Sequence, residues 1–245
     1  MKRIMLLVAY DGTNYHGWQV QPNGITIEGV LNEALTNLLG ETITVIGASR
    51  TDAGVHALGN AAVFDTETRI PSDKLSYALN QRLPEDIVVQ DSCEVPSDFH
   101  PRYRESRKTY EYKILNRKFP LPLNRRDTYF TYRYIDVEKM RQAARYLVGE
   151  HDFKSFCSEH AQVNSTIRTI HSLTVTKERE VITIHVTGNG FLYNMVRIIA
   201  GTLLQAGMGE REPEEVERIL SARNRAAAGP TAPAHGLTMV GIEWL

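Results

Sequence analysis

Residues 47–57 read G-A-S-R-T-D-A-G-V-H-A and lie between two runs, residues 43–46 and 59–65, whose composition is typical of β-strands. The stretch is therefore expected to form a loop that connects two strands. Gly54 permits backbone conformations that residues with a Cβ atom resist.

This loop carries one arginine, Arg50, and a single carboxylate, Asp52. The side chains around them are mostly small, which leaves room for a ligand to approach. Two interpretations fit the pattern. One is a surface turn in which the aspartate bonds its own backbone, and the other is a functional loop that presents one carboxylate.

The elements on either side of the loop give the first half of the chain its order. Residues 2–9 form an apolar run that predicts a strand, and Thr26 and Gly40 are placed to begin and end a helix. A second helix is expected over residues 71–83, followed by a strand over residues 87–95. The order β-α-β-β-α-β is that of a ferredoxin-like fold.

The second half has a similar order of elements. They are expected as a strand at 108–115, a short strand at 128–134, a helix from Asp136 to 148, a hairpin at 165–176 and 181–187, an apolar helix at 191–206, a helix from Pro213, and a strand at 238–244. The sequence therefore predicts an α+β protein with two RRM-like halves. They span residues 1–96 and 106–245, and residues 97–105 link them.

Composition narrows the class of protein. The 245 residues are 42% hydrophobic and 23% charged, which is typical of a globular protein. No apolar run approaches the roughly 20 residues that span a bilayer, and residues 1–9 lack a signal-peptide cleavage site. Cys93 and Cys157 form neither a disulfide framework nor a metal-ligand spacing. We therefore expect a cytoplasmic protein without a membrane partner.

Charge is distributed unevenly. The net charge is −1, but residues 101–126 hold nine basic and two acidic residues, whereas the rest of the chain has 19 basic and 27 acidic ones. Such asymmetry is typical of a surface that binds a phosphate backbone. A basic face that meets only solvent is the alternative. Within this segment aromatic residues such as Tyr110 are interleaved with cations, as in proteins that stack unpaired bases, although Tyr110 is also compatible with a core position.

Arg197 lies within the strongly apolar helix expected over residues 191–206. A buried cation without a counter-charge is costly, so Arg197 is expected to pair with a carboxylate. That pair has either a structural or a functional role.

Four short segments of this sequence resemble motifs of the TruA family of tRNA pseudouridine synthases. They are residues 47–57, the stretch R-K-T-Y-E-Y at 107–112, the stretch F-L-Y-N-M-V-R at 191–197, and Y-D-G-T-N-Y-H-G-W-Q at 10–19. The resemblance spans almost the whole chain.

The resemblance implies roles for individual residues. Asp52 is the expected nucleophile, and Arg197 its partner. Tyr110 is expected to stack on the target uracil and is a candidate acceptor for the C5 proton. In such a reaction Arg50 or Arg197 is expected to steady the uracil anion that leaves. The candidate site residues are thus Asp52, Arg50 and Arg197 for catalysis, and Tyr110, Arg102, Arg104, Arg107 and Lys108 for substrate binding.

Two other segments resemble family loops. Residues 228–237 are similar to a small-residue loop that borders the pocket, although a plain connector fits them nearly as well. Residues 10–21 are expected to touch RNA through Trp18, His16 and Gln19, which are predicted to be exposed.

The resemblance also implies an activity and an assembly. The expected activity converts uridines 38, 39 and 40 of the tRNA anticodon arm to pseudouridine, without a cofactor. The expected assembly is a homodimer. In each chain the two ferredoxin-like halves share one continuous antiparallel sheet, with helices on one face and the active-site cleft on the other.

Two alternatives remain. A non-enzymatic RNA-binding module explains the basic segment but leaves Arg197 and the Asp52 loop unexplained. A metal nuclease needs clustered carboxylates, and the loop has one. His151 with Asp152, and His160 near Cys157, lack the spacing of zinc ligands, so no metal is expected.

Overall fold

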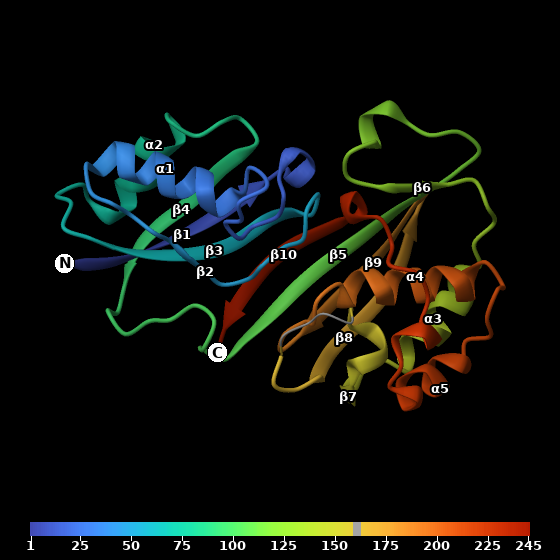
Figure 1. Cartoon of the computed structure of the whole chain (residues 1–245). Helices are drawn as coiled ribbons and strands as arrows, with labels where there is room; N and C mark the ends of the chain where they lie inside the picture. The colour runs from blue at the N-terminus through green and yellow to red at the C-terminus, as the bar shows by residue number, and fades with distance from the viewer. Residues whose placement is uncertain (159–162) are drawn as a thin grey trace. The chain divides into compact units, whose positions relative to one another are not determined.

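The computed structural model describes residues 1–158 and 163–245 (Figure 1). The chain divides into two compact units. The first unit comprises Met1–Glu105 and Met239–Leu245, and the second comprises Ser106–Thr238. Both contain helices and strands, which confirms the predicted α+β class. Residues 97–105 group with the first unit.

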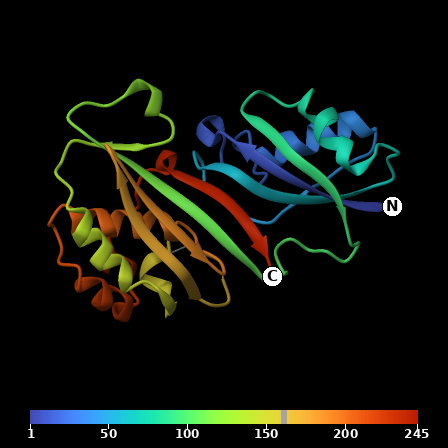
Figure 2. The same cartoon turned by 180° about the vertical axis from the view of Figure 1, so that it is seen from behind.

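The first unit is an antiparallel sheet covered by two helices. Its elements are β1 (Lys2–Tyr10), α1 (Ile27–Leu39), β2 (Ile46–Gly47), β3 (His56–Thr66), α2 (Leu75–Asn80) and β4 (Ile87–Val95). β1 lies between β4 and β3, and β2 pairs with β3. Figures 1 and 2 show α1 and α2 on the same face of this sheet. Buried aliphatic side chains of β1 and α1 form the core between these layers.

The ends of α1 are as predicted. The Thr26 hydroxyl accepts a hydrogen bond from the Gly29 N–H at 3.2 Å, which caps the helix. Gly40 ends it with a left-handed backbone, φ +70°.

The strand predicted over residues 43–46 is wrong in extent, because β2 contains only Ile46 and Gly47. Side chains of α1 form hydrogen bonds with the backbone just before β2 instead. The Ile43 N–H donates to the Thr36 hydroxyl at 3.1 Å, and the Val45 N–H donates to Asn32 Oδ1 at 2.8 Å. These bonds take the place of a strand ladder.

The second unit is also a sheet with helices. Its elements are β5 (Ser106–Asn116), β6 (Tyr129–Thr131), α3 (Val137–Arg145), β7 (Gly149–Asp152), β8 (Ile167–Glu178), β9 (Val181–Gly188), α4 (Met195–Gly207) and α5 (Glu215–Ala222). The sheet order is β5-β9-β8-β7, and β6 runs parallel to β5. β8 and β9 form the predicted hairpin, whereas β7 was not predicted. The last strand, β10 (Leu237–Trp244), begins in this unit and ends among residues of the first.

The apolar helix predicted from residue 191 begins only at Met195. Asn194 has a positive φ of +61°, a conformation that a right-handed helix does not contain. α4 is buried along nearly its whole length, and it packs against α3 and β5. No helix in residues 1–158 or 163–245 is both long enough and apolar enough to cross a bilayer.

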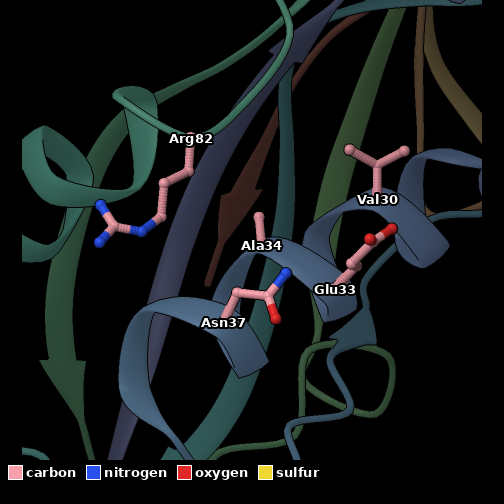
Figure 3. A pocket seen from close by; sticks show the side chains of 5 residues that line it. All are labelled: Val30, Glu33, Ala34, Asn37 and Arg82. Carbon is pink, nitrogen blue, oxygen red and sulfur yellow. The ribbon is translucent and has the colours of Figure 1, made fainter.

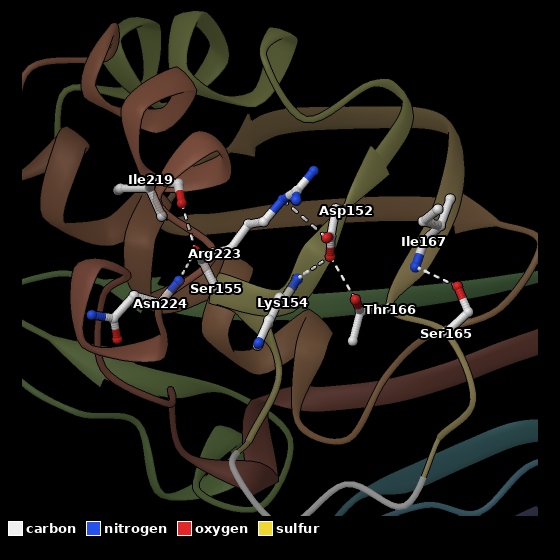
Figure 4. Close-up of polar contacts among 9 residues, drawn as sticks. All are labelled: Asp152, Lys154, Ser155, Ser165, Thr166, Ile167, Ile219, Arg223 and Asn224. Carbon is white, nitrogen blue, oxygen red and sulfur yellow. Dashed lines mark hydrogen bonds and ion pairs between the residues drawn. The ribbon is translucent and has the colours of Figure 1, made fainter.

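Asp152 connects three parts of the second unit (Figure 4). Its Oδ1 accepts hydrogen bonds from the Thr166 hydroxyl at 2.6 Å and from the Lys154 N–H at 3.1 Å, and its Oδ2 lies 3.1 Å from Arg223 Nε. The bond from Thr166 is the main cause that lowers the pKa of the Asp152 carboxyl, although desolvation opposes it.

We expect Asp152→Asn to lower the free energy of unfolding at pH 7 by about 1–2 kcal/mol, because a charge-assisted network loses its anion. The folded-state pKa is depressed, so this stability is present above the unfolded pKa of about 3.9 and is lost as pH falls through the folded value. Urea unfolding of both proteins between pH 7 and pH 3 measures the difference. Glu150→Gln, at an exposed position of the same strand, is the control. A difference that does not shrink toward pH 3 contradicts the prediction.

Candidate active site

The loop of residues 47–57 is held to the first unit's sheet by its backbone. The Ala48 N–H donates to the Ala61 carbonyl at 2.7 Å, and the Val55 N–H donates to the Asp52 carbonyl at 3.1 Å, closing a turn. Gly54 has a φ of +77°, the left-handed conformation expected of it. The loop is therefore a fixed turn that follows β2.

Side chains of the loop alternate between the interior and the surface. Thr51 and Val55 are buried, whereas Arg50 is exposed and Asp52 is half-buried. The structure thus leaves Asp52 partly exposed on a backbone whose neighbours are packed inside.

Residues 10–21 support this loop, and the prediction that Trp18 is exposed is wrong. Trp18 has no exposed surface, and a Cβ atom on Gly47 would lie only 2.2 Å from its indole Nε1. The backbone N–H of Trp18 donates to the Thr51 carbonyl at 3.1 Å. His16 and Gln19 are exposed, as predicted.

Glycines allow the close approach of these two segments. A Cβ atom at Gly12 would lie 2.0 Å from the Val55 carbonyl oxygen, and one at Gly17 would lie 2.5 Å from the Thr51 oxygen. Sequence reasoning did not assign this role to Gly12 and Gly17. Two glycines in one short loop were the available signal that another backbone lies against them.

Two predicted RNA-binding cations lie in the first unit. Arg102 is exposed, and its Nε donates to the Gly47 carbonyl at 2.7 Å, at the start of the loop. The Arg104 guanidinium lies 5.6 Å from the centre of the Phe99 ring. Arg102 is therefore brought to the Asp52 loop, and Arg104 lies against the segment expected as a link.

Tyr110 lies on β5 of the second unit and is only 7% exposed. Its ring meets the Phe191 ring edge-on, with centroids 5.2 Å apart and planes at 80°. The preceding cations lie at the start of the same strand, where Arg107 is exposed and Lys108 is half-buried. β5 therefore carries two of the predicted RNA-binding cations at its start and a buried Tyr110 further along.

Arg197 lies in the first turn of α4 and is half-buried. Its Nε donates to the Ala232 carbonyl at 2.8 Å, its Nη1 donates to Asn194 Oδ1 at 2.8 Å, and its own carbonyl accepts from the Ala232 N–H at 3.1 Å. The guanidinium thus has a fixed orientation. Sequence reasoning identified the cation but missed both of these partners.

The segment 228–237 is tightly packed on α4. A Cβ atom at Gly201 would lie 1.9 Å from the Pro230 carbonyl oxygen, and the Gly229 N–H donates to the Thr202 hydroxyl at 3.0 Å. The Tyr112 hydroxyl donates to the Pro233 carbonyl at 2.9 Å. Burial raises the pKa of Tyr112, so this hydroxyl keeps its proton.

Metal-binding groups are absent from the described residues, which contain no cluster of three or more His, Cys, Asp or Glu side chains arranged to hold an ion. His151 bonds the Val148 carbonyl at 3.0 Å, and His160 lies outside the described residues. A separate hollow beside α1 contains none of the predicted site residues. Figure 3 shows its lining side chains, Val30, Glu33, Ala34, Asn37 and Arg82.

A family model described as tRNA pseudouridine synthase matches residues 6–104 and 143–244. The chain belongs to the tRNA pseudouridine synthase family. The two matched segments contain Arg50, Asp52 and Arg197, whereas Tyr110 lies between them.

Proteins named tRNA pseudouridine synthase A are similar over almost the full length. One from Thermoanaerobacter sp. (strain X514) is 49% identical over 242 residues, covering 99% of each chain. One from Ruminiclostridium cellulolyticum is 49% identical over 245 residues, covering both chains completely. One from Halalkalibacterium halodurans is 48% identical over 238 residues, 97% of this chain and 90% of the relative. As a tRNA pseudouridine synthase, the chain is an isomerase that acts on uridine in tRNA.

Proposed function

We propose that this tRNA pseudouridine synthase isomerises uridines 38, 39 and 40 of the tRNA anticodon arm, with Asp52 as the nucleophile. The observation that carries the assignment is the Asp52 loop. It has one carboxylate, half-buried, on a turn whose flanking residues are fixed by packing and hydrogen bonds. The choice of uridines follows the resemblance of the whole chain to the family.

The proposed reaction replaces the glycosidic C–N bond between uracil and ribose with a bond from uracil C5 to C1′. The target nucleotide leaves the base stack, and Asp52 attacks C1′ as the glycosidic C–N bond breaks and uracil departs as an anion. The uracil turns, its C5 attacks C1′, and the ester to Asp52 breaks. The C5 proton is then lost, and N1 gains a proton. A glycal route, in which Asp52 assists without attacking C1′, breaks and forms the same base–sugar bonds. Nothing is oxidised or imported, so the reaction needs no cofactor.

Other residues bind or stabilise in this proposal. Tyr110 is the platform for the flipped uracil, and its contact with the Phe191 ring supports that role. Arg197 keeps Asp52 ionised, since a guanidinium favours the charged form of a carboxylate. Arg50 steadies the uracil anion. The residues proposed to contact tRNA phosphates are Arg102, Arg104, Arg107 and Lys108.

Three broader features belong to the same proposal. The enzyme works in the cytoplasm as a homodimer, and its two units are ferredoxin-like halves that share one sheet. The element order β1-α1-β2-β3-α2-β4 and the strand neighbours of the first unit support the assignment of that half.

Tritium release tests the substrate assignment. The purified chain, without added metal or cofactor, is incubated with tRNA carrying [5-³H]uridine, because formation of the C5 bond expels the tritium. We expect release from a tRNA with uridine at 38, 39 or 40, and none when cytidine replaces all three. Equal release from both tRNAs contradicts the assignment to these positions but leaves the isomerase activity standing.

A further inference from the structure

Three buried side chains beneath the Asp52 loop are connected by hydrogen bonds. The Asn60 amide nitrogen donates to the Ser49 carbonyl at 2.9 Å and to the Tyr10 hydroxyl at 3.4 Å, and the Tyr10 and Thr51 hydroxyls are 2.7 Å apart. Ser49 and Thr51 flank Arg50, and Thr51 directly precedes Asp52. We name Tyr10, Thr51 and Asn60 the loop bracket.

The orientation of Asn60 is fixed. Its Oδ1 accepts from the Ala61 N–H at 3.0 Å, so its amide nitrogen has to face the loop. The amide hydrogens then point to Ser49 and Tyr10. The phenol that receives one of them is in place to bond Thr51. β3, which carries Asn60, and β1, which carries Tyr10, are neighbours in the sheet.

Burial makes these bonds difficult to replace. Asn60 has no exposed surface, and Tyr10, Thr51 and Ser49 are 5%, 7% and 8% exposed. Water therefore has little access to substitute for a lost partner, and the loop has to shift to satisfy the orphaned group. A shift of Thr51 moves the adjacent Asp52.

We propose that the loop bracket of Tyr10, Thr51 and Asn60 positions Asp52 for attack on the ribose, an inference that rests on the proposed role of Asp52. These are positioning residues, because they act through the backbone of the loop and not on the substrate. Displacement of a reacting group by about 1 Å costs roughly 10²-fold in rate. The bracket therefore affects the chemical step and leaves tRNA binding nearly unchanged.

The test compares Tyr10→Phe and Thr51→Val with the control Thr66→Val. Thr66 is 1% exposed and lies in the same unit, but it ends β3 and its hydroxyl donates to Glu41, away from the loop. Single-turnover pseudouridine formation, tRNA dissociation constants and melting temperatures are measured for each. Both bracket variants are expected to react about tenfold or more slowly with a dissociation constant within about twofold of wild type. Thr66→Val is expected to lower only the melting temperature.

Two further variants separate positioning from general damage. Thr51→Ser keeps the hydroxyl and is expected to react at the wild-type rate. The double variant Tyr10→Phe with Thr51→Val is expected to be about as slow as the slower single variant, because either change alone already removes the bond between the Tyr10 and Thr51 hydroxyls. Bracket variants that react as fast as Thr66→Val overturn the proposal. Asp52→Asn in the same assay is read separately: if it keeps the wild-type rate, the role of Asp52 itself fails.

Discussion

Asp52→Asn is expected to lower the rate of pseudouridine formation by at least about 10⁴-fold, because an amide cannot attack C1′ or stabilise its developing charge. The amide has nearly the same shape as the carboxylate, and the loop backbone is held by contacts that do not involve this side chain. tRNA affinity is therefore expected to stay within about threefold of wild type. Tritium release under single-turnover conditions gives the rate, and filter binding gives the affinity.

Asp73→Asn is the matched control for Asp52→Asn. It removes the same charge from the same unit, at a side chain that is 66% exposed and pairs with Lys74. We expect wild-type rate and affinity from it. An Asp52→Asn enzyme that retains more than about a hundredth of wild-type activity would rule out Asp52 as the nucleophile.

Tyr110→Ala should lower kcat/KM by about 10- to 100-fold, since stacking of a base on an aromatic ring contributes about 1–3 kcal/mol. Tyr110→Phe keeps both the ring and its contact with Phe191. If the phenol only stacks, the phenylalanine variant keeps most of the activity. If the phenolate also accepts the C5 proton, glycosidic cleavage continues while tritium release slows.

The two substitutions are compared by steady-state kinetics and by single-turnover tritium release. Melting temperatures identify any loss that comes from the cavity left by alanine, because Tyr110 is largely buried. Unchanged kcat/KM in a folded Tyr110→Ala enzyme contradicts the stacking role.

Local patterns predicted those parts of the fold that local chemistry determines. Thr26 and Gly40 bracket α1 because a cap and a left-handed glycine act within one turn of the chain. The β8–β9 hairpin follows from alternation along adjacent segments. The four motif-like segments indicated the family, and the matches to the family model and to related synthases confirm it.

Predictions failed where distant residues decide the outcome. The backbone N–H groups of Ile43 and Val45 bond side chains of α1, which no strand propensity reveals. Trp18 looked like an exposed ring in a polar loop, but it fills the space that Gly47 leaves. Ala232, the partner of Arg197 on the segment 228–237, was missed for the same reason.

The contact between Trp18 and Gly47 also limits how the sequence can change over generations. The Trp18 indole occupies the volume that a side chain at position 47 would need, so Gly47 is not free to vary alone. A lineage that replaced Gly47 with any larger residue would need a smaller ring at position 18 in the same step. The two positions are 29 residues apart in the chain, and related sequences are expected to change them together.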